Sequence, residues 1–433
     1  MKHSRLISGL ALITILVGSM QMVLADTAAV ASTKNNSGLY ESVQDFANIM
    51  SLVKNNYVDE VDSKTLLENA IAGMLAGLDP HSAYLNKADF EELQSETTGE
   101  FGGLGIEISM EDGFIKVISP IDDTPAKRAG ILPGDIIIRI DDKPIKGLNF
   151  NEAIELLRGK PGSTVTLTIL RTNSDEPKKI SLERAIIKSR SVRTKLIEKD
   201  FAYVRVAQFQ SHTAADLEKG LTQLIKENKQ PIKGLILDMR SNPGGVLQAA
   251  IDISDFFLDK GMIVSLKGRN INKNIEEYQA HAGDLLNGAP IVLLVNEGSA
   301  SASEIVAGAL KDHKRAVIMG QRTFGKGSVQ TIEALGNGTA VKLTTARYYT
   351  PAGVSIQAHG IEPDIELKQL NVSVVNETLG SVHEGDLSRH LENLDDKKSK
   401  DDLKTNADLV ESDFALYQAL TVLKGMTLNT RNP

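Results

Sequence analysis

The sequence predicts an α/β core that is preceded by a helical region and by a small α+β domain. Three observations support this fold class. From Leu39 onward, apolar residues recur at three- and four-residue spacing. Phe101–Arg171 contains short β runs separated by turn sequences, and Lys188–Leu367 alternates apolar strands with helices. A chain of 433 residues is long enough for these two or three domains.

The composition narrows the class of protein. Hydrophobic residues make up 41% and charged residues 24%, which is ordinary for soluble globular protein. The formal net charge of −8, the lack of a basic stripe and the lack of Trp argue against a nucleic-acid partner. Without cysteine there is no disulfide and no thiol nucleophile. The eight histidines form no metal-ligand spacing, so we expect neither a metal nor another cofactor.

The N-terminus is typical of a secretory signal peptide. Lys2 and Arg5 precede the uncharged, mostly apolar stretch Leu6–Leu24, and Val23-Leu24-Ala25 offers a cleavage site before Asp26. This predicts export of the mature chain. The alternative is an uncleaved membrane anchor, because about 20 apolar residues can span a bilayer.

The region that follows is predicted to be helical. Asp26–Ser37 is a polar leader, and a first helix then carries Val43, Phe46 and Ile49 on one face. Further helices are expected at Lys64–Leu75 and Ala88–Leu93, with a break at Leu78-Asp79-Pro80-His81 between them. Apolar faces without a core of their own are typical of helices that pack on a partner subunit, so we expect a homo-oligomer.

The small α+β domain opens with a glycine-rich segment. Gly102-Gly103-Leu104-Gly105-Ile106 precedes a predicted strand. Backbone N–H groups in such a loop bind a C-terminal carboxylate, and the adjacent strand edge accepts a peptide by β-augmentation. A glycine-rich loop alone is weak support for this function. The expected strands and helices of the domain are Gly105–Ser109, Phe114–Ile118, Asp135–Ile140, Thr164–Leu170, Pro125–Ala129 and Phe150–Leu157.

The core carries a candidate nucleophile after one of its buried strands. Ile291–Val295 is followed by Asn296–Glu304, which contains Ser299, Ser301 and Ser303 and opens a helix. A serine at this turn lies at the mouth of the sheet, and the helix N-terminus offers free N–H groups for an oxyanion. The alternative is a purely structural Ser-x-x-Glu capping box. Spacing does not choose among the three serines.

Lys326 is the candidate base, in Thr323-Phe324-Gly325-Lys326-Gly327-Ser328. Burial between glycines would lower its pKa and leave the amine neutral, whereas a solvated lysine would stay protonated. Gln330 follows four residues later and could orient the amine, or be an ordinary polar strand residue. Gly244-Gly245 follows the strand Gly234–Met239 and could supply a second oxyanion donor, or be a tight turn.

Taken together, these segments resemble the C-terminal processing peptidases, also called tail-specific proteases. The resemblance covers Leu39–Leu367, and the ordered set of motifs is much more specific than any one of them. The motifs are Leu78-Asp79-Pro80-His81-Ser82, Gly102–Ile106, Gly134-Asp135, Asn242-Pro243-Gly244-Gly245, Ser299–Glu304 and Phe324-Gly325-Lys326-Gly327.

The resemblance implies specific roles for the candidate residues. It makes Ser301 the nucleophile, Lys326 the base and Gln330 the residue that orients the lysine. It assigns the oxyanion to the N–H groups of Gly245 and Ala302. Peptide binding is assigned to the glycine-rich segment Gly103, Leu104, Gly105 and Ile106.

The family fold is a crotonase-like (ClpP-like layered) α/β core with an inserted PDZ-like domain whose strand order is circularly permuted. The expected boundaries are a signal peptide at 1–25, a helical region at 26–98, the PDZ-like domain at 99–187, the peptidase core at 188–370, and a charged linker with a C-terminal helix at 371–433. The charged segment Asn371–Ser412 matches nothing in the family pattern.

The implied function is that of an exported serine endopeptidase without a metal or cofactor. It would recognise protein substrates with apolar C-terminal tails and cleave them through an acyl-enzyme. In bacteria this family often acts on cell-envelope proteins, which predicts a periplasmic location, or an inner-membrane one if the N-terminal segment stays uncleaved. An adaptor lipoprotein is a further candidate partner. Neither the natural substrate nor the need for an adaptor follows from the sequence.

Three other functions compete with this one. A binding scaffold with an inactive core is disfavoured by the intact Ser301, Lys326 and Gln330. A PDZ-containing trypsin-like protease would need a His/Asp/Ser set on β-barrels, which the α/β pattern does not supply. An acyl-CoA enzyme with a crotonase-like core is disfavoured by the PDZ-like domain and by Lys326.

Overall fold

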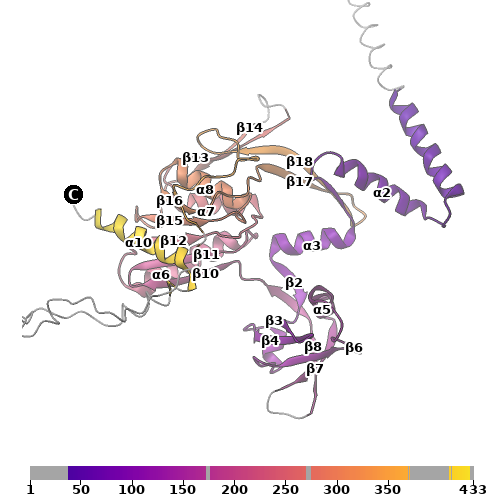
Figure 1. The fold of residues 1–433 in the computed structure, drawn as a ribbon, viewed down its shortest axis with the longest axis horizontal. Coiled ribbons are helices and arrows are strands. Elements are labelled where there is room, and N and C mark those ends of the chain that lie inside the picture. The colour runs from indigo at the N-terminus through magenta and orange to yellow at the C-terminus, as the bar shows by residue number, and fades with distance from the viewer. Residues whose placement is uncertain are drawn as a thin grey trace, which may run out of the picture. The chain divides into compact units, whose positions relative to one another are not determined.

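The computed structural model describes residues 38–171, 176–269, 275–368, 370, 409, 410 and 412–429 (Figure 1). It divides into two compact units, 1–84 and 85–433, with the boundary inside the short strand β1 (Ala83–Leu85). The predicted signal peptide, the leader after it and residues 371–408 of the predicted linker lie outside the described residues.

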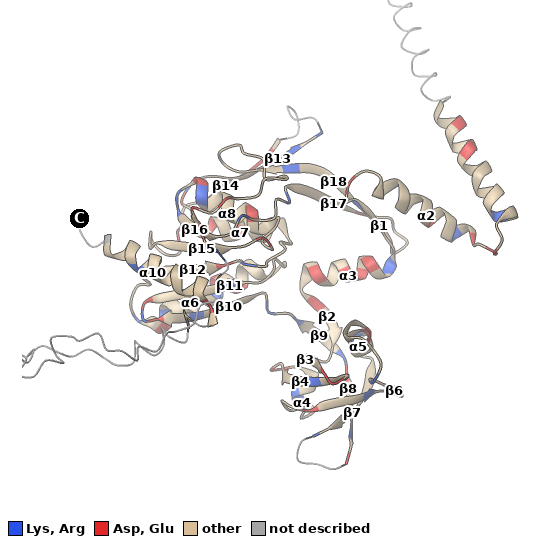
Figure 2. Cartoon of the chain, viewed as in Figure 1, with Lys and Arg blue, Asp and Glu red and all other residues tan. Residues whose placement is uncertain are grey.

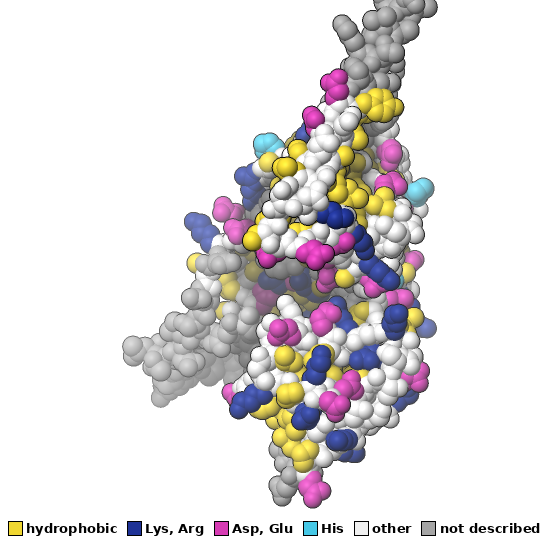
Figure 3. All heavy atoms as spheres, turned by 90° about the vertical axis from the view of Figure 1, so that its right-hand side faces the viewer, with side chains coloured by type: hydrophobic (Ala, Val, Ile, Leu, Met, Phe, Trp, Pro, Cys, Tyr) yellow, Lys and Arg dark blue, Asp and Glu magenta, His cyan; other side chains and the backbone are white. Residues whose placement is uncertain are grey.

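In its described residues, 38–84, the first unit contains two helices, as predicted. They span residues 38–56 and α2 (Ser63–Ala76). Asp62 caps α2 because its carboxylate accepts hydrogen bonds from the N–H groups of Lys64 and Thr65. Large apolar side chains remain exposed along both helices, and hydrophobic side chains are visible in yellow in the upper part of Figure 3. The exposed residues include Leu39, Val43, Ile49, Leu52 and Met74.

The small domain of the second unit is built on an antiparallel sheet. Its strand order is β3 (Ile106–Glu111), β4 (Phe114–Pro120), β5 (Ile136–Ile140), β7 (Thr164–Leu170) and β8 (Lys178–Glu183), with β6 (Lys143–Pro144) paired to β5. The helices are α4 (Pro125–Arg128) and α5 (Phe150–Leu157). The predicted strands are confirmed to within a few residues, and β3 lies at the edge of the sheet.

Asp135 holds the end of this sheet together. Its carboxylate is almost fully buried and accepts hydrogen bonds from the Leu132 N–H and from Arg171, at 2.7 Å for Arg171 Nε. The hydrogen bond to Asp135 raises the pKa of Arg171. Gly134-Asp135 therefore has a structural role in the domain.

Three short elements connect the small domain to the core. Helix α3 (Lys87–Thr98) leads into β2 (Glu100–Gly103), which pairs antiparallel with β9 (Ala185–Lys188). Asn86 caps α3, and the left-handed Gly99 ends it. The segments entering and leaving the small domain are thus tied to each other by a two-stranded ladder.

The core contains the predicted α/β sheet. Its strand order is β10 (Val192–Glu198), β11 (Phe201–Val206), β12 (Gly234–Asp238), β15 (Ile291–Val295), β16 (Ala316–Gly320) and β19 (Ile365–Glu366). Only β10 runs antiparallel to its neighbour. Strands β12 and β15 are buried throughout, which is why they read as continuous apolar runs in the sequence.

Helices cover both faces of this sheet. On one face, Leu235, Leu237 and Leu293 pack in the same cluster as residues of α6 (Thr213–Asn228), α7 (Leu247–Asp255) and α8 (Ala302–Asp312). On the other face, Ile236, Val292 and Leu294 pack with α10 (Phe414–Asn429). The alternation follows from the period of two along each strand. It confirms the layered α/β core and the predicted C-terminal helix.

A second, antiparallel sheet lies over the helices of the core. Within it, β18 (Ala340–Tyr349) pairs with both β17 (Ser328–Ala334) and β13 (Gly261–Gly268), and β13 pairs with β14 (Ile275–Ala280). Residues Ile263, Leu266 and Tyr348 of this sheet share the large core cluster with α7 and α8. The strand β14 was not predicted, because its sequence is mostly polar and exposed.

Candidate active site

The candidate nucleophile, base and oxyanion donors lie in three segments that directly follow parallel strands of the core. Gly245 follows β12, Ser301 and Ala302 follow β15, and Lys326 follows β16. Because β12, β15 and β16 are neighbours and run parallel, their carboxyl ends lie along one edge of the sheet. The sheet topology therefore brings together segments that are far apart in the chain, from Gly245 to Lys326.

The structure distinguishes among the three candidate serines. Ser299 and Ser303 are fully buried, and their hydroxyls donate to the carbonyls of Met239 (2.8 Å) and Asn242 (3.0 Å). Ser301 is 8% exposed and occupies the N-cap of α8. Two hydroxyls are thus used for structure, and Ser301 is the serine that can be reached from outside.

Ser301 has a strained backbone. Its φ is 54° and its ψ is −110°, a conformation that costs a non-glycine residue about 1–3 kcal/mol. The conformation is held because the Ser301 N–H donates to the Glu304 carboxylate at 2.8 Å and the Ser301 carbonyl accepts from the Ile305 N–H at 3.0 Å. Strain that is held in this way at a strand-to-helix turn is typical of a functional serine.

The Gly244-Gly245 segment lies directly against Ser301. A methyl group on Gly244 would lie 2.8 Å from Ser301 Cβ and 3.1 Å from the Ala302 nitrogen. Asn242 fixes this turn, since its side-chain oxygen accepts from the Gly244 N–H at 3.0 Å. The N–H groups of Gly245 and Ala302 donate no hydrogen bond to any residue that the structure describes. Both are therefore free to donate to an oxyanion beside Ser301.

Glu304 links the serine turn to the lysine loop. This carboxylate is fully buried and accepts from the Ser301 N–H, the Thr323 hydroxyl (2.6 Å), the Gly325 N–H (2.7 Å) and the Lys326 N–H (2.9 Å). Burial raises the pKa of Glu304, and the four hydrogen bonds work against that rise. Sequence reasoning missed this role, because the capping box accounts only for the bond to Ser301. The available signal was a carboxylate within an apolar helix.

The glycines beside Lys326 permit close packing of two loops. The Gly327 N–H donates to the Gln357 side chain at 3.0 Å, and the Gly325 carbonyl accepts from the Ala358 N–H at 2.9 Å. A methyl group on Gly327 would lie 2.2 Å from the Gln357 nitrogen. Glycine is thus required there by backbone approach.

Lys326 is half-buried, and its pKa is lowered. Burial is the main cause, and the positive charge of Lys342 adds to it, whereas the negative charge of Glu304 acts in the opposite direction. Loss of hydration disfavours the ammonium form, so the environment promotes the neutral amine that a general base requires.

Gln330 has different partners from those that the resemblance implies. Its side-chain amide donates to the Ser328 hydroxyl at 2.8 Å and to the Thr344 hydroxyl at 3.4 Å. Within the described residues, no hydrogen bond joins the Lys326 amine to Gln330 or to the Ser301 hydroxyl. The structure thus brings the lysine loop to the serine turn through Glu304, without a hydrogen bond between the two functional groups among the described residues. Hydrogen bonds of this kind often tighten only when substrate binds.

The small domain has a pocket at the predicted peptide-binding segment. The pocket has a volume of about 150 Å³ and is lined by Gly103, Leu104, Gly105 and Ile106, together with Ile108, Phe101, Ile154, Leu157 and Arg158. Ile154 and Leu157 belong to α5, so the pocket lies between this helix and the edge strand β3. The guanidinium of Arg158 stacks over the Phe101 ring at 5.1 Å. This arrangement can bind an apolar side chain of a peptide whose backbone pairs with the edge of β3.

One feature of that segment differs from the expectation. Gly102 and Gly103 are not in a loop but in β2, paired with Ile186 and Ala185 of β9. Only Leu104 and Gly105 lie between strands, and their N–H groups donate to none of the described residues. The carboxylate-binding turn is therefore shorter than the glycine pattern suggested.

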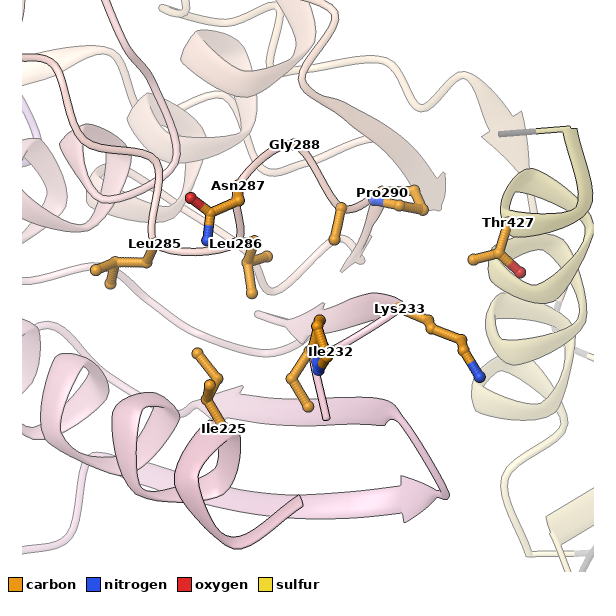
Figure 4. Close-up of a pocket in the computed structure, with 11 residues that line it drawn as sticks. Ile225, Ile232, Lys233, Leu285, Leu286, Asn287, Gly288, Pro290 and Thr427 are labelled. Carbon is orange, nitrogen blue, oxygen red and sulfur yellow. The ribbon is translucent and has the colours of Figure 1, made fainter. Parts of the chain in front are cut away.

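A larger pocket of about 390 Å³ lies elsewhere in the core (Figure 4). It is lined by Ile225, Ile232, Lys233, Leu286 and Pro290, among others. Lys233 and Pro290 immediately precede β12 and β15. This pocket is thus at the amino ends of the strands, at the opposite edge of the sheet from Ser301, and takes no part in the candidate active site.

Within the described ranges, no group of three or more His, Asp or Glu residues is arranged to hold a metal ion. In the same part of the chain, no helix is long and apolar enough to cross a bilayer.

Comparisons with known proteins show the family to which this chain belongs. Residues 200–367 match the model of peptidase family S41, residues 102–182 match the PDZ domain, and residues 12–89 match the N-terminal domain of the activating protease CtpB. The carboxy-terminal-processing protease of Bartonella bacilliformis is 49% identical over 341 residues, which are 78% of this chain and 78% of that protein. The carboxy-terminal processing protease CtpB of Bacillus subtilis is 36% identical over 364 residues, which are 82% of this chain and 74% of that protein.

Among solved structures, the photosystem II D1 C-terminal processing protease is 32% identical, with a TM-score of 0.44 over 74% of this chain and 92% of that chain. The sequence matches define the chain as a serine peptidase that carries a PDZ domain. It belongs to peptidase family S41, among the carboxy-terminal-processing proteases, and the predicted resemblance is confirmed.

Proposed function

We propose that this protein is an exported endopeptidase that captures apolar C-terminal tails in its PDZ domain and cleaves the substrate chain with Ser301 and Lys326. One observation carries the proposal. Of the three serines at the turn, only Ser301 is strained and accessible. Its N–H donates to the Glu304 carboxylate, which also accepts from the N–H of Lys326 in the lysine loop.

The proposed reaction uses groups of this chain alone. Neutral Lys326 accepts the proton of the Ser301 hydroxyl as the oxygen attacks the scissile carbonyl. The N–H groups of Gly245 and Ala302 donate to the oxyanion that forms. The protonated Lys326 then gives its proton to the leaving amine, and an acyl-enzyme remains. Water, deprotonated by Lys326, then attacks the acyl carbonyl, and the protonated Lys326 returns the proton to the Ser301 oxygen as the acid product leaves. In the substrate complex, the side-chain oxygen of Gln330 accepts a hydrogen bond from the Lys326 amine and orients it, which leaves the amine lone pair free for the serine proton.

The tail-binding step predicts a preference for a free carboxylate. Two peptides with the same apolar C-terminal tail, one with a free carboxylate and one amidated, are given to the full chain. We expect kcat/KM to be about tenfold higher for the free acid, because a carboxylate makes charge-assisted hydrogen bonds with the N–H groups of Leu104 and Gly105. Cleavage is measured with and without EDTA, which we expect to have no effect. Equal cleavage of both peptides would contradict tail recognition.

The lysine base predicts a pH dependence with a defined sign. The positive charge of Lys342 lowers the pKa of Lys326. In Lys342→Gln that contribution is lost and the pKa of Lys326 rises, so a higher pH is needed to deprotonate the base. We expect the ascending limb of kcat/KM against pH to move to higher pH, and the exposed Lys219→Gln to leave it in place. A limb that moves to lower pH in Lys342→Gln would argue against Lys326 as the base.

The exposed apolar residues of the first unit support self-association of the enzyme. Residues Leu39, Val43, Ile49 and Leu52 leave an apolar surface on the first unit, which supports burial against a second copy of the chain. Sedimentation velocity, in which we expect a species larger than the monomer, tests this.

We propose residues 1–25 as a signal peptide that directs the enzyme to the periplasm, 99–187 as the PDZ-like domain and 188–370 as the peptidase core. Envelope proteins are the proposed substrates, with an adaptor lipoprotein as a candidate partner.

A further inference from the structure

The second sheet carries a group of positive side chains on one face. Lys267 of β13 lies directly opposite Arg347 of β18, and Arg347 in turn lies opposite Ser328 of β17. Residues that face each other across a ladder point to the same side of the sheet. Lys267, Arg347 and Ser328 therefore form one row across three strands. Basic positions on β13 are shown in blue in Figure 2.

This arrangement is unfavourable unless something negative binds to it. Like charges directly opposite each other destabilise a sheet. Among the described residues, neither Lys267, Arg269 nor Arg347 forms an ion pair, although the whole chain has a net charge of −8. Lys267 instead lies over the Tyr349 ring at 4.2 Å. Glu277 of β14 is diagonal to Lys267 across the ladder, and it forms no ion pair with it.

The same residues surround a pocket. Its volume is about 470 Å³, and it is lined by Lys267, Arg269, Arg347, Tyr349, Thr344 and Thr345. Its charged side chains are all basic, and its hydroxyls add further hydrogen-bond donors. Guanidinium groups in particular bind carboxylates through two parallel N–H donors.

The pocket adjoins the candidate active site. Thr344 lines the pocket, and its hydroxyl accepts a hydrogen bond from the Gln330 amide. Ser328, at the end of the basic row, also accepts from Gln330 and lies two residues after Lys326. Lys267 lies two strands away from Ser328, and Ser328 lies two residues along the chain from Lys326. Strand spacing and rise per residue together put Lys326 and Lys267 about 12 Å apart. An extended peptide covers this distance in about three to four residues.

We propose that this pocket is an anion-binding subsite beside the active site, which binds Asp or Glu side chains of the substrate about three to four residues from the scissile bond. This inference rests on the proposed peptidase function. It gives the substrate two separate requirements: an apolar tail for the PDZ domain, and an acidic segment near the cleaved bond. The uncompensated charges are kept because substrate carboxylates neutralise them.

The test uses three peptides that share one tail and one cleavage site, the latter mapped first by mass spectrometry. At the positions two to five residues from the scissile bond, they carry acids, the matching amides, or lysines. We expect the wild type to cleave the acidic peptide with a kcat/KM about five- to tenfold higher than that of the amide peptide. In Lys267→Gln/Arg347→Gln this ratio is expected to fall to about one, and in Arg347→Glu the lysine peptide becomes preferred.

A matched pair controls for net charge. Lys219→Gln/Lys226→Gln removes two exposed positive charges from α6, and the acidic preference is expected to remain. The Tm of Lys267→Gln/Arg347→Gln is expected to be at least that of the wild type, because a repulsive pair has been removed. A Tm at or above the wild-type value would show that Lys267→Gln/Arg347→Gln folds. An acidic preference that is absent from the wild type, survives in Lys267→Gln/Arg347→Gln, or disappears equally in the α6 pair would overturn the subsite.

A binding measurement separates this inference from the proposed function. Affinities of Ser301→Ala for the acidic and amide peptides are measured by fluorescence anisotropy, with and without Lys267→Gln/Arg347→Gln. A preference of about five- to tenfold for the acidic peptide that depends on Lys267 and Arg347 supports the subsite. This holds even if the wild type cleaves neither peptide, because a lack of cleavage would count only against the proposed function. Equal binding of both peptides would overturn the subsite while leaving cleavage untouched.

Discussion

Ser301→Ala is expected to reduce cleavage of a tail-bearing peptide by at least about 10³-fold, because no other hydroxyl at the turn can replace the nucleophile. Ser299 and Ser303 are fully buried, and both donate to backbone carbonyls. Peptide binding by the PDZ domain should be unchanged, since its pocket consists of residues from a different domain. Single-turnover cleavage and tail-peptide anisotropy on the same preparation measure the two effects separately.

The matched variants make this result specific. Lys326→Ala should be as inactive as Ser301→Ala, and Lys326→Arg should be inactive too, because a guanidinium stays protonated and cannot accept the serine proton. Ser299→Ala removes a neighbouring buried hydroxyl at a cost of about 1–3 kcal/mol in stability but leaves the nucleophile in place. Substantial activity in Ser301→Ala, or inactivity of a folded Ser299→Ala, would assign the nucleophile to another residue.

Glu304→Ala is expected to have the largest combined effect on stability and activity. It leaves the Ser301, Gly325 and Lys326 N–H groups and the Thr323 hydroxyl without their buried acceptor. Loss of such a charged partner typically costs about 3–5 kcal/mol. Because Ser301 and Lys326 are both positioned by this carboxylate, kcat should also fall by at least about 100-fold.

Two further variants distinguish positioning from general destabilisation. Thr323→Ala removes a single donor to Glu304 and should retain most of the activity while losing about 1 kcal/mol of stability. Glu304→Gln keeps the shape and one acceptor oxygen, and should fall between wild type and Glu304→Ala in both Tm and kcat. A Glu304→Ala enzyme with a wild-type kcat at a temperature where it is folded would show that Glu304 has only a structural role.

Much of the fold could be read from the sequence, because its signals are local. The apolar runs at Gly234–Asp238 and Ile291–Val295 are buried strands, as their continuous hydrophobicity indicates. The helix that begins at Ala302 was indicated by its capping box. The elements that were not predicted include strands β8, β10, β11 and β14 and helix α6, besides several strands of two to four residues. Several of these elements carry charged residues on an exposed face, which weakens their hydrophobic pattern.

Resemblance and structure contributed different parts of the site. The ordered motifs pointed to Ser301 and Lys326, and the structure independently separates Ser301 from Ser299 and Ser303 by the bonds of their hydroxyls. For Gln330 the structure shows bonds to Ser328 and Thr344, and its contact with Lys326 stays a prediction for the substrate complex. The bridging role of Glu304 was not predicted, because three of the four groups that donate to its carboxylate belong to the lysine loop, Thr323–Lys326.

The sequence by itself determined the order of domains, the buried strands and the chemical groups available for catalysis, since these depend on hydrophobic period, turn residues and residue type. Tertiary structure alone decided which groups meet. Parallel pairing of β12, β15 and β16 brings Gly245, Ser301 and Lys326 to one edge. Strand register likewise places Lys267 opposite Arg347. Such contacts depend on how distant segments pair, and no local pattern encodes that pairing.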